Sequence, residues 1–130
     1  MKQINKYIVE RLRINKDTGN HHYNYHPKTY DELEELVNKL MKERGNNADL
    51  NDIDTSEITN MYALFYDSFF NGDISQWNVS KVEDMGTMFQ YSEFTGENGD
   101  ISKWDVSNVK NMYHMFYKSP LEKNPPKWYK

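Results

Sequence analysis

The sequence predicts an α/β repeat fold, in which a short solenoid of stacked units follows an N-terminal helical cap. Two observations lead to this prediction. Residues 72–85 are repeated nearly unchanged at residues 99–112. A repeat of this length is typical of units that each bury an apolar face only against their neighbours. Residues 29–45 carry the start, the apolar stripe and the stop of one amphipathic helix.

Composition limits the core and the available chemistry. The chain of 130 residues has room for one domain, and its 37% hydrophobic content predicts a thin core. Aromatic residues, at 15% of the chain, compensate because each buries a large area. The absence of cysteine excludes disulfides, thiolate zinc sites and thiol nucleophiles, and it favours a reducing compartment.

Three short elements are expected before the main helix. Apolar residues at helical spacing predict a short helix at residues 4–12. Residues 15–20 have the composition of a turn. Tyr23 and Tyr25 alternate with polar residues, which predicts a strand that ends at Pro27.

The main helix is predicted over residues 30–44. Thr29 and Glu32 have the spacing of a capping box, in which each side chain satisfies a backbone N–H at the start of the helix. Gly45 stops the helix because glycine adopts the left-handed conformation easily. The apolar stripe consists of Leu33, Leu36, Val37, Leu40 and Met41.

From residue 46 onwards the repeat organises the chain, with offsets of 24 and 27 residues. The corresponding positions are Leu50, Ile74 and Ile101; Ile53, Trp77 and Trp104; Thr55, Val79 and Val106; Ser56, Ser80 and Ser107; Ile58, Val82 and Val109; Met61, Met85 and Met112; Phe65, Phe89 and Phe116. The longer offset places three extra residues near residues 97–99. Trp128 lies 24 residues after Trp104, so residues 125–129 form a truncated fourth unit.

Each unit contains the apolar pattern Ile-x-x-Trp-x-Val, which resembles the Leu-x-x-Leu-x-Leu strand of leucine-rich repeats. In that interpretation Ile74, Trp77 and Val79 point inward, while Gln76 and Asn78 point outward. The expected fold is a short leucine-rich-repeat solenoid with an N-terminal helical cap.

The second half of each unit predicts a short helical turn. Asp84 suits the N-cap of a turn over residues 85–90. Met85, Met88 and Phe89 would then pack inward as core residues.

The units closely resemble the repeat of the BspA-like leucine-rich-repeat proteins, in the variant with Trp-Asp-Val-Ser-Asn-Val and Met-Phe signatures. Residues 71–89 carry this resemblance most clearly. Such repeats occur in surface proteins of gut bacteria and mollicutes, and in shorter unexported proteins of Bacteroides-type bacteria and their phages. The expected division is into residues 1–45, with a helix, a strand and a capping helix, and residues 46–130, with three leucine-rich repeats and a truncated C-terminal capping repeat. The resemblance covers residues 46–130. It implies no common ligand.

The outward positions of the predicted strands form the candidate binding face, because repeat proteins commonly bind through such a surface. These positions are Asp52, Asp54, Gln76, Asn78, Lys103, Asp105, Lys127 and Tyr129. They differ between units, whereas the inward positions repeat. We therefore expect a non-catalytic module that binds another protein. Carbohydrate or cell-surface binding through Tyr129 and other aromatics, and a structural role in an assembly, are the alternatives.

No catalytic, cofactor or metal site is predicted. His21, His22 and His26 are metal-binding residue types, but their spacing and the lack of nearby acidic ligands favour exposed polar side chains. Ser80 and Ser107 occupy a repeating structural position, and His114 has no repeated counterpart. Nothing in the pattern brings a nucleophile and a base together.

Charge and hydropathy indicate the partners to exclude. Residues 46–130 carry seven Lys and Arg against thirteen Asp and Glu, which disfavours binding to a nucleic-acid backbone. No apolar run is long enough to span a membrane, and no signal-peptide pattern is visible. The expectation is a cytoplasmic protein, with surface exposure left open.

Overall fold

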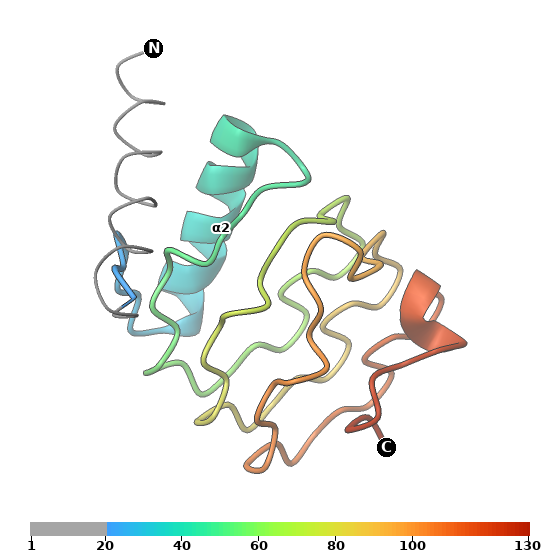
Figure 1. Ribbon diagram of the computed structural model, residues 1–130. Helices are drawn as coiled ribbons and strands as arrows, with labels where there is room; N and C mark the ends of the chain where they lie inside the picture. Colours follow the sequence, from blue (N-terminus) through green and yellow to red (C-terminus); the bar gives the residue numbers. More distant parts are fainter. Residues whose placement is uncertain (1–20) are drawn as a thin grey trace.

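The computed structural model describes residues 21–130 (Figure 1). It contains the α-helix α2, Tyr30–Arg44, and the short 3-10 helix η1, Pro120–Glu122. The helix predicted at residues 4–12 and the turn predicted at residues 15–20 lie outside the described residues.

Helix α2 begins and ends as predicted. The backbone N–H of Glu32 donates to the Thr29 hydroxyl over 3.2 Å, and the Glu32 carboxylate accepts from the Lys28 N–H over 2.7 Å. Both bonds satisfy donors that a helix start leaves unpaired. Gly45 follows the helix at the predicted residue, and its N–H donates to the Met41 carbonyl. Its φ of 90° and ψ of 177° are not the expected left-handed conformation, but they lie in another region that favours glycine. The buried stripe is Leu33, Val37 and Leu40.

The predicted fold class is wrong. The described residues contain one α-helix and four isolated parallel β-bridges, and they form no strand or sheet. The predicted strand at Tyr23 and Tyr25 is reduced to a single bridge between Tyr25 and Ile53. The chain is therefore not an α/β leucine-rich-repeat solenoid, and the binding face cannot be a face of a strand sheet.

Side-chain turns explain why the expected strands do not form. Asp73 Oδ1 accepts from the Ser75 N–H over 2.9 Å, and Asn78 Oδ1 accepts from the Ser80 N–H over 3.0 Å. Asp and Asn favour such turns because they bond to the backbone two residues ahead. The pattern returns in the next unit at Asp100 and Asp105. Each turn takes a backbone N–H out of a possible ladder and bends the chain.

Left-handed residues explain why the predicted helical turn at residues 85–90 is also absent. Non-glycine residues adopt positive φ at two positions of each of the three full units. They are Ala63, Thr87 and His114 at the first position, and Asp67, Tyr91 and Lys118 at the second. A right-handed helix cannot continue through a left-handed residue, so each segment is a chain of turns.

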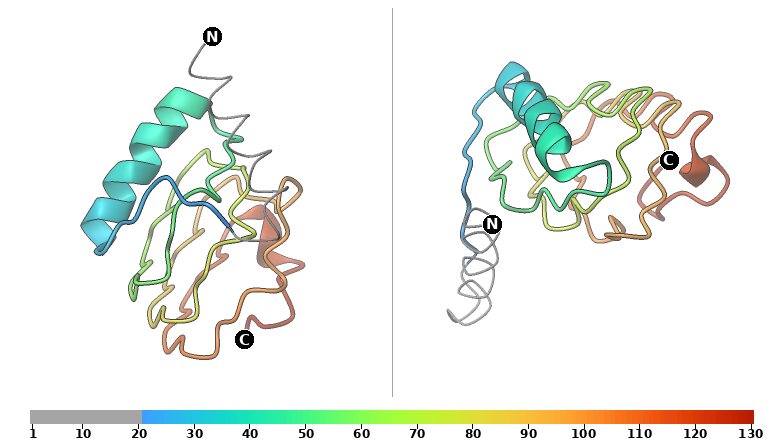
Figure 2. Two further views of the ribbon diagram at one scale, coloured as in Figure 1. Left: turned by 60° about the vertical axis from the view of Figure 1, so that its left-hand side comes forward. Right: turned by 90° about the horizontal axis from the view of Figure 1, so that it is seen from above.

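The units nevertheless lie side by side, as the ribbon shows in Figures 1 and 2. Three tryptophan side chains, Trp77, Trp104 and Trp128, show the register of the units, and we call them the indole ladder. Trp77 Nε1 donates to the Leu50 carbonyl over 2.9 Å, and Trp104 Nε1 donates to the Ile74 carbonyl over 3.2 Å. Trp128 repeats the contact with Ile101 over 2.9 Å. Each indole thus satisfies a carbonyl of the preceding unit, which explains why tryptophan suits this position.

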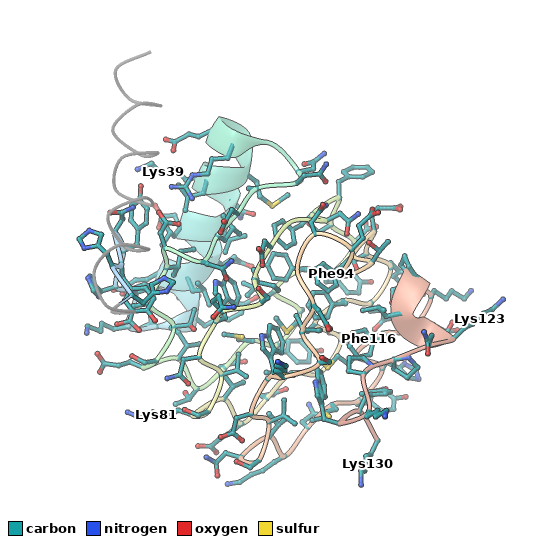
Figure 3. The ribbon with its side chains drawn as sticks, in the orientation of Figure 1. Lys39, Lys81, Phe94, Phe116, Lys123 and Lys130 are labelled. Carbon is teal, nitrogen blue, oxygen red and sulfur yellow. The ribbon has the colours of Figure 1, made fainter. Side chains whose placement is uncertain are left out.

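Aromatic rings form the centre of the core. Phe65, Phe89 and Phe116 are stacked, with centroids 5.6 and 5.5 Å apart and rings within 5° of parallel. Phe70 and Phe94 form a second stack beside them, with centroids 6.1 Å apart. Figure 3 shows Phe94 and Phe116 among the packed side chains. The predicted inward residues are confirmed as core, since Leu50, Ile74, Met85, Met88 and their neighbours are buried.

Candidate functional site

A hollow of about 560 Å³ lies between the second and third units. Buried Trp77 and Trp104 contribute to its lining, as do the exposed side chains of the turns beside them. Four residues of the predicted binding face lie together here: Gln76, Asn78, Lys103 and Asp105. The structure therefore brings half of the predicted residues to one place, although no strand carries them.

Two of these four residues hold turns. Asn78 Oδ1 accepts from both the N–H and the hydroxyl of Ser80, over 3.0 and 2.7 Å. Asp105 Oδ1 accepts from the Ser107 N–H over 3.1 Å. Hydrogen bonds from Ser107 lower the pKa of Asp105 below its ordinary value, so this carboxylate is charged at neutral pH. The first role of Asn78 and Asp105 is therefore to stabilise the local turns.

Gln76 and Lys103 are the polar residues of the hollow whose side chains form no hydrogen bond in the described part of the chain, although Lys103 interacts electrostatically with Asp100. Both side chains are exposed, and neither makes a hydrogen bond within residues 21–130. Asp100, at the edge of the same hollow, accepts from the N–H and the hydroxyl of Ser102, and these bonds lower its pKa. The hollow thus combines two amides and one cation with two carboxylates.

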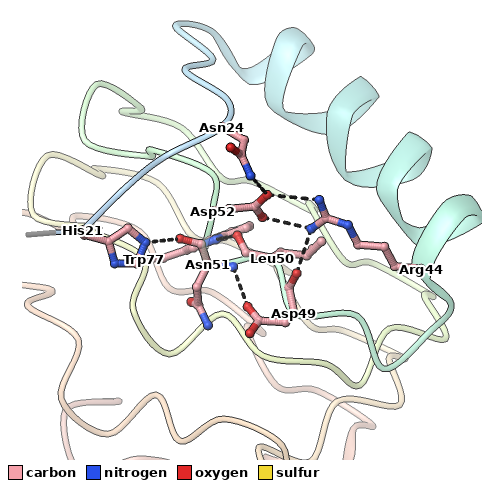
Figure 4. A network of polar contacts seen from close by, with 8 residues as sticks. All are labelled: His21, Asn24, Arg44, Asp49, Leu50, Asn51, Asp52 and Trp77. Carbon is pink, nitrogen blue, oxygen red and sulfur yellow. Dashed lines mark hydrogen bonds and ion pairs between the residues drawn. The ribbon is translucent and has the colours of Figure 1, made fainter. Parts of the chain in front are cut away.

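Asp52 is not part of this site. Its side chain is 7% exposed and forms a bidentate ion pair with Arg44 at the end of α2, over 2.9 and 3.0 Å. Asn24 also donates to it over 2.8 Å, and Figure 4 shows this network. Burial raises the pKa of Asp52, but the hydrogen bonds from Arg44 and Asn24 outweigh burial and lower it. The predicted outward position is therefore a buried structural contact.

Asp54 likewise has a structural role. Its carboxylate accepts from the Ser56 N–H over 3.0 Å and contacts His26 Nδ1 at 3.3 Å. Burial raises the pKa of Asp54, and the bonds from Ser56 and His26 lower it by more. The first unit therefore uses this position to join the chain before α2 to the repeats.

The last two predicted residues lie beyond the hollow. Lys127 is exposed. Tyr129 packs edge-on against Phe116, with ring centroids 5.1 Å apart. Tyr129 therefore helps to close the end of the core, and neither residue lines the hollow.

The sequence profile of one protein family matches residues 32–129 of the chain, and its description reads "Mycoplasma protein of unknown function, DUF285". The chain belongs to this family. The match takes in nearly all of α2 together with the repeating units. Searches of curated proteins and of solved structures gave no significant match.

This member of the DUF285 family also carries an aromatic row that the sequence interpretation missed. Tyr66 lies edge-on to Tyr91 with centroids 5.7 Å apart, and Tyr91 lies 6.0 Å from Tyr117. Tyr117 stacks on His114 at 4.6 Å. Tyr66 and Tyr117 occupy the same repeat position, but Tyr91 is one residue out of register. Only folding places the three together.

The histidines lie apart from the hollow. His21 Nε2 contacts the Asn51 carbonyl at 2.7 Å, and His26 contacts Asp54. Within residues 21–130, no group of three or more His, Cys, Asp and Glu residues could hold a metal ion. Among the helices described, none has the length and apolar composition needed to cross a membrane.

Proposed function

We propose that the chain is a non-catalytic module that binds another protein through the hollow between its second and third units. The observation that supports this proposal is the meeting of Gln76 and Lys103, two exposed side chains without a hydrogen-bonding partner in the described chain. They occupy equivalent positions of two units with different chemistry, on a framework whose core positions repeat.

The chemistry of the hollow suits a polar protein surface. Lys103 lies near the carboxylates of Asp100 and Asp105, so the hollow presents charges of both signs within a small area. Alternating charge favours a partner of complementary pattern and disfavours a uniformly charged polymer such as nucleic acid. Hydrogen bonds from Ser102 and Ser107 hold the carboxylates of Asp100 and Asp105 in place, which lowers the entropic cost of binding.

We also propose that the units are repeats of the BspA-like type, which they resemble in sequence. The description of the family that the chain belongs to states no function. The proposal also includes a cytoplasmic location, in keeping with a chain that has no cysteine.

A photo-crosslinking amino acid at position 76 tests the proposal. The full chain is used to capture partners from the native organism, and the crosslinked protein is identified by mass spectrometry and purified. We expect Lys103→Glu to weaken its binding at least about tenfold, because charge reversal in the hollow changes electrostatic complementarity.

Lys39→Glu is the matched control, since Lys39 is an exposed lysine on α2 and lies outside the hollow. Figure 3 labels it on the helix. Equal binding by the two variants would place the interface elsewhere.

Carbohydrate binding is the second candidate, and the row of Tyr66, Tyr91 and Tyr117 favours it. Tyr66 and Tyr91 are 48% and 40% exposed, and aromatic faces offer apolar surface with a polar edge. Glycan-array binding that Tyr91→Ala abolishes would support this function. A blank array together with a protein captured through position 76 would reject it.

A further inference from the structure

The dipeptide Asn-Gly occurs twice in the chain, at Asn71-Gly72 and at Asn98-Gly99, 27 residues apart. This distance equals the offset between the second and third units, so the two pairs have the same place in neighbouring units. An asparagine before a glycine is chemically reactive, because glycine has no side chain to shield its backbone nitrogen from the asparagine amide. The structure gives the two pairs different surroundings.

Both polar atoms of the Asn71 side chain are held. Its Oδ1 accepts from the N–H and the hydroxyl of Thr95, over 2.8 and 3.0 Å. Its Nδ2 donates to the Glu97 carboxylate over 3.1 Å. Thr95 and Glu97 lie where the longer offset adds residues to the chain. The lengthened segment therefore fixes the amide of Asn71 with three hydrogen bonds.

Asn98 is much less constrained. The residue is exposed, and the one hydrogen bond of its side chain in the described chain runs from Nδ2 to the Asn71 carbonyl, over 2.7 Å. The backbone differs in the same sense. The N–H groups of Asn71 and Asp73 donate to carbonyls of the first unit over 2.8 and 2.9 Å, whereas those of Asn98 and Asp100 make no hydrogen bond within residues 21–130.

The two glycines do not distinguish the pairs. The Gly99 N–H donates to the Gly96 carbonyl over 3.2 Å, and the Gly72 N–H makes no hydrogen bond in the described part of the chain. Both glycines are closely packed, because a Cβ atom would lie 1.9 Å from the Ala48 carbonyl oxygen at Gly72 and 2.1 Å from Asp73 Oδ1 at Gly99. The freedom of the asparagine residues is therefore the difference between the two pairs.

We propose that Asn98 is a site of spontaneous deamidation and that Asn71 is its protected counterpart. Hydroxide from water removes the proton of the Gly99 N–H, and the electron pair of this nitrogen attacks Cγ of Asn98. The new N–Cγ bond closes a succinimide ring. The bond between Cγ and Nδ2 breaks, and Nδ2 takes a proton from water and leaves as ammonia.

A water molecule then opens the succinimide ring in one of two ways. Addition at Cγ breaks the new N–Cγ bond and gives aspartate at position 98. Addition at the backbone carbonyl carbon of residue 98 breaks its bond to the Gly99 nitrogen and gives isoaspartate, in which the chain continues through the side chain. In both cases one water is consumed and one ammonia is released, and nothing is oxidised or reduced.

The hydrogen bonds explain why the two sites should react at different rates. An intramolecular attack needs aligned atoms roughly 3–3.5 Å apart, and a misplacement of about 1 Å can slow a reaction about 100-fold. Asn71 must break three side-chain bonds before its Cγ can turn towards the Gly72 nitrogen. Asn98 must break one bond at an exposed position, where water can take over the donor and the acceptor.

Deamidation at Asn98 would change the contact between the second and third units. Both products replace the Nδ2 donor with a carboxylate, so the Asn71 carbonyl loses its hydrogen bond from residue 98. Isoaspartate also lengthens the backbone two residues before Asp100, which lies at the edge of the hollow. The reaction itself does not depend on any binding at the hollow.

The test uses the full chain labelled with nitrogen-15 and kept folded in mildly alkaline buffer. The side-chain NH₂ signals of Asn71 and Asn98 are followed by NMR, and peptide mapping by mass spectrometry identifies aspartate and isoaspartate. We expect the Asn98 signal to disappear at least about tenfold faster than the Asn71 signal. Equal rates, or a faster loss at Asn71, would overturn the proposal.

The unfolded chain is the control for the sequence itself. Both Asn-Gly pairs are followed by aspartate, so the two rates should become similar in guanidinium chloride, where the hydrogen bonds of Asn71 are absent. An Asn98 amide that persists in the folded chain for as long as the Asn71 amide, while both react in denaturant, would show that folding protects the two sites equally and would reject the proposal.

Two variants test the residues assigned. Asn98→Gln should abolish the reaction at position 98, because the longer side chain closes a ring less readily. Glu97→Ala removes the acceptor of Asn71 Nδ2 and should speed the loss at Asn71 several-fold. Glu93→Ala is the matched control, since Glu93 is an exposed glutamate whose side chain does not contact Asn71. An Asn71 rate that Glu97→Ala leaves unchanged would overturn the assignment of Asn71 as the site protected by these bonds.

Discussion

Arg44 and Asp52 form a bidentate ion pair that fastens the end of α2 to the first repeating unit. Arg44 also donates to the Asp49 carbonyl over 2.9 Å, so one guanidinium spans the turn that follows the helix. Asn24 joins the same carboxylate from the segment before the helix. The contact thus connects three parts of the chain at the end of the array.

The first prediction concerns this ion pair. Asp52→Asn keeps the shape of the side chain but leaves Arg44, 20% exposed, without its counter-charge. We expect the free energy of unfolding to fall by about 2 kcal/mol, because a partly buried charge loses its partner. Chemical denaturation measures this change. Glu57→Gln is the control, since the Lys28 and Glu57 pair is exposed and its loss should have little effect. Equal effects of the two substitutions would contradict the prediction.

The same carboxylate predicts how stability depends on pH. The pKa of Asp52 is lower in the folded protein than in the unfolded chain, so its ionised form favours folding. This stabilisation is complete above the unfolded pKa of about 3.9, and it is lost as the pH falls through the folded value. The stability difference between the parent chain and Asp52→Asn should therefore be constant near neutral pH and shrink below about pH 4. A stability difference that grows as the pH falls would contradict this prediction.

The indole ladder gives a third prediction. Trp77→Phe keeps an aromatic ring but removes the donor to the Leu50 carbonyl, which lies in the core. A buried carbonyl without a partner costs about 1–3 kcal/mol. Trp128→Phe removes the equivalent donor at the half-buried end of the array, where water can replace it, and should cost less. Thermal unfolding of both variants checks the order, and a larger loss at Trp128 would refute it.

Two glycines allow a fourth prediction. A Cβ atom on Gly72 would lie 1.9 Å from the Ala48 carbonyl oxygen, where the Asp73 N–H already donates over 2.9 Å. Gly72→Ala must push the first two units apart, and we expect a loss of about 3 kcal/mol or more. Gly45→Ala meets no atom within 4 Å and adds only the cost of its backbone conformation, about 1–3 kcal/mol, so its loss should be the smaller. Denaturation midpoints of the two variants should differ accordingly, and similar midpoints would count against the close packing of the units.

The two alanines of the chain give a fifth prediction about backbone conformation. Ala63 has φ of 56°, whereas Ala48 is buried without a positive φ. In Ala63→Gly the relief of left-handed strain offsets the flexibility of glycine, so stability should change by less than about 0.5 kcal/mol. Ala48→Gly loses a buried methyl group as well and should cost about 1–2 kcal/mol. Equal losses at both positions would show that the left-handed turn at Ala63 is absent.

The candidate site could be predicted only in part. Gln76 and Lys103 were recognisable because they occupy polar positions between core residues of the repeat. The burial of Asp52 was not recognisable from the sequence, because Asp52 occupies the same position of its unit as the exposed Gln76. Only the packing of α2 brings Arg44 to Asp52. A signal for the turns was present. The repeated Asp-x-Ser and Asn-x-Ser triplets are typical of side-chain turns, and they should have counted against strands.

The sequence by itself determined α2 and the core, because capping bonds act within a few residues and the repeated apolar positions must all leave water. It did not determine the backbone path between core residues. Nothing in the residue types of Ala63 or Thr87 indicates a left-handed turn, in which the N–H of each residue donates to a carbonyl of the next unit. The tertiary structure decides which N–H and carbonyl groups of neighbouring units meet. It also decided which polar residues remain free to bind a partner.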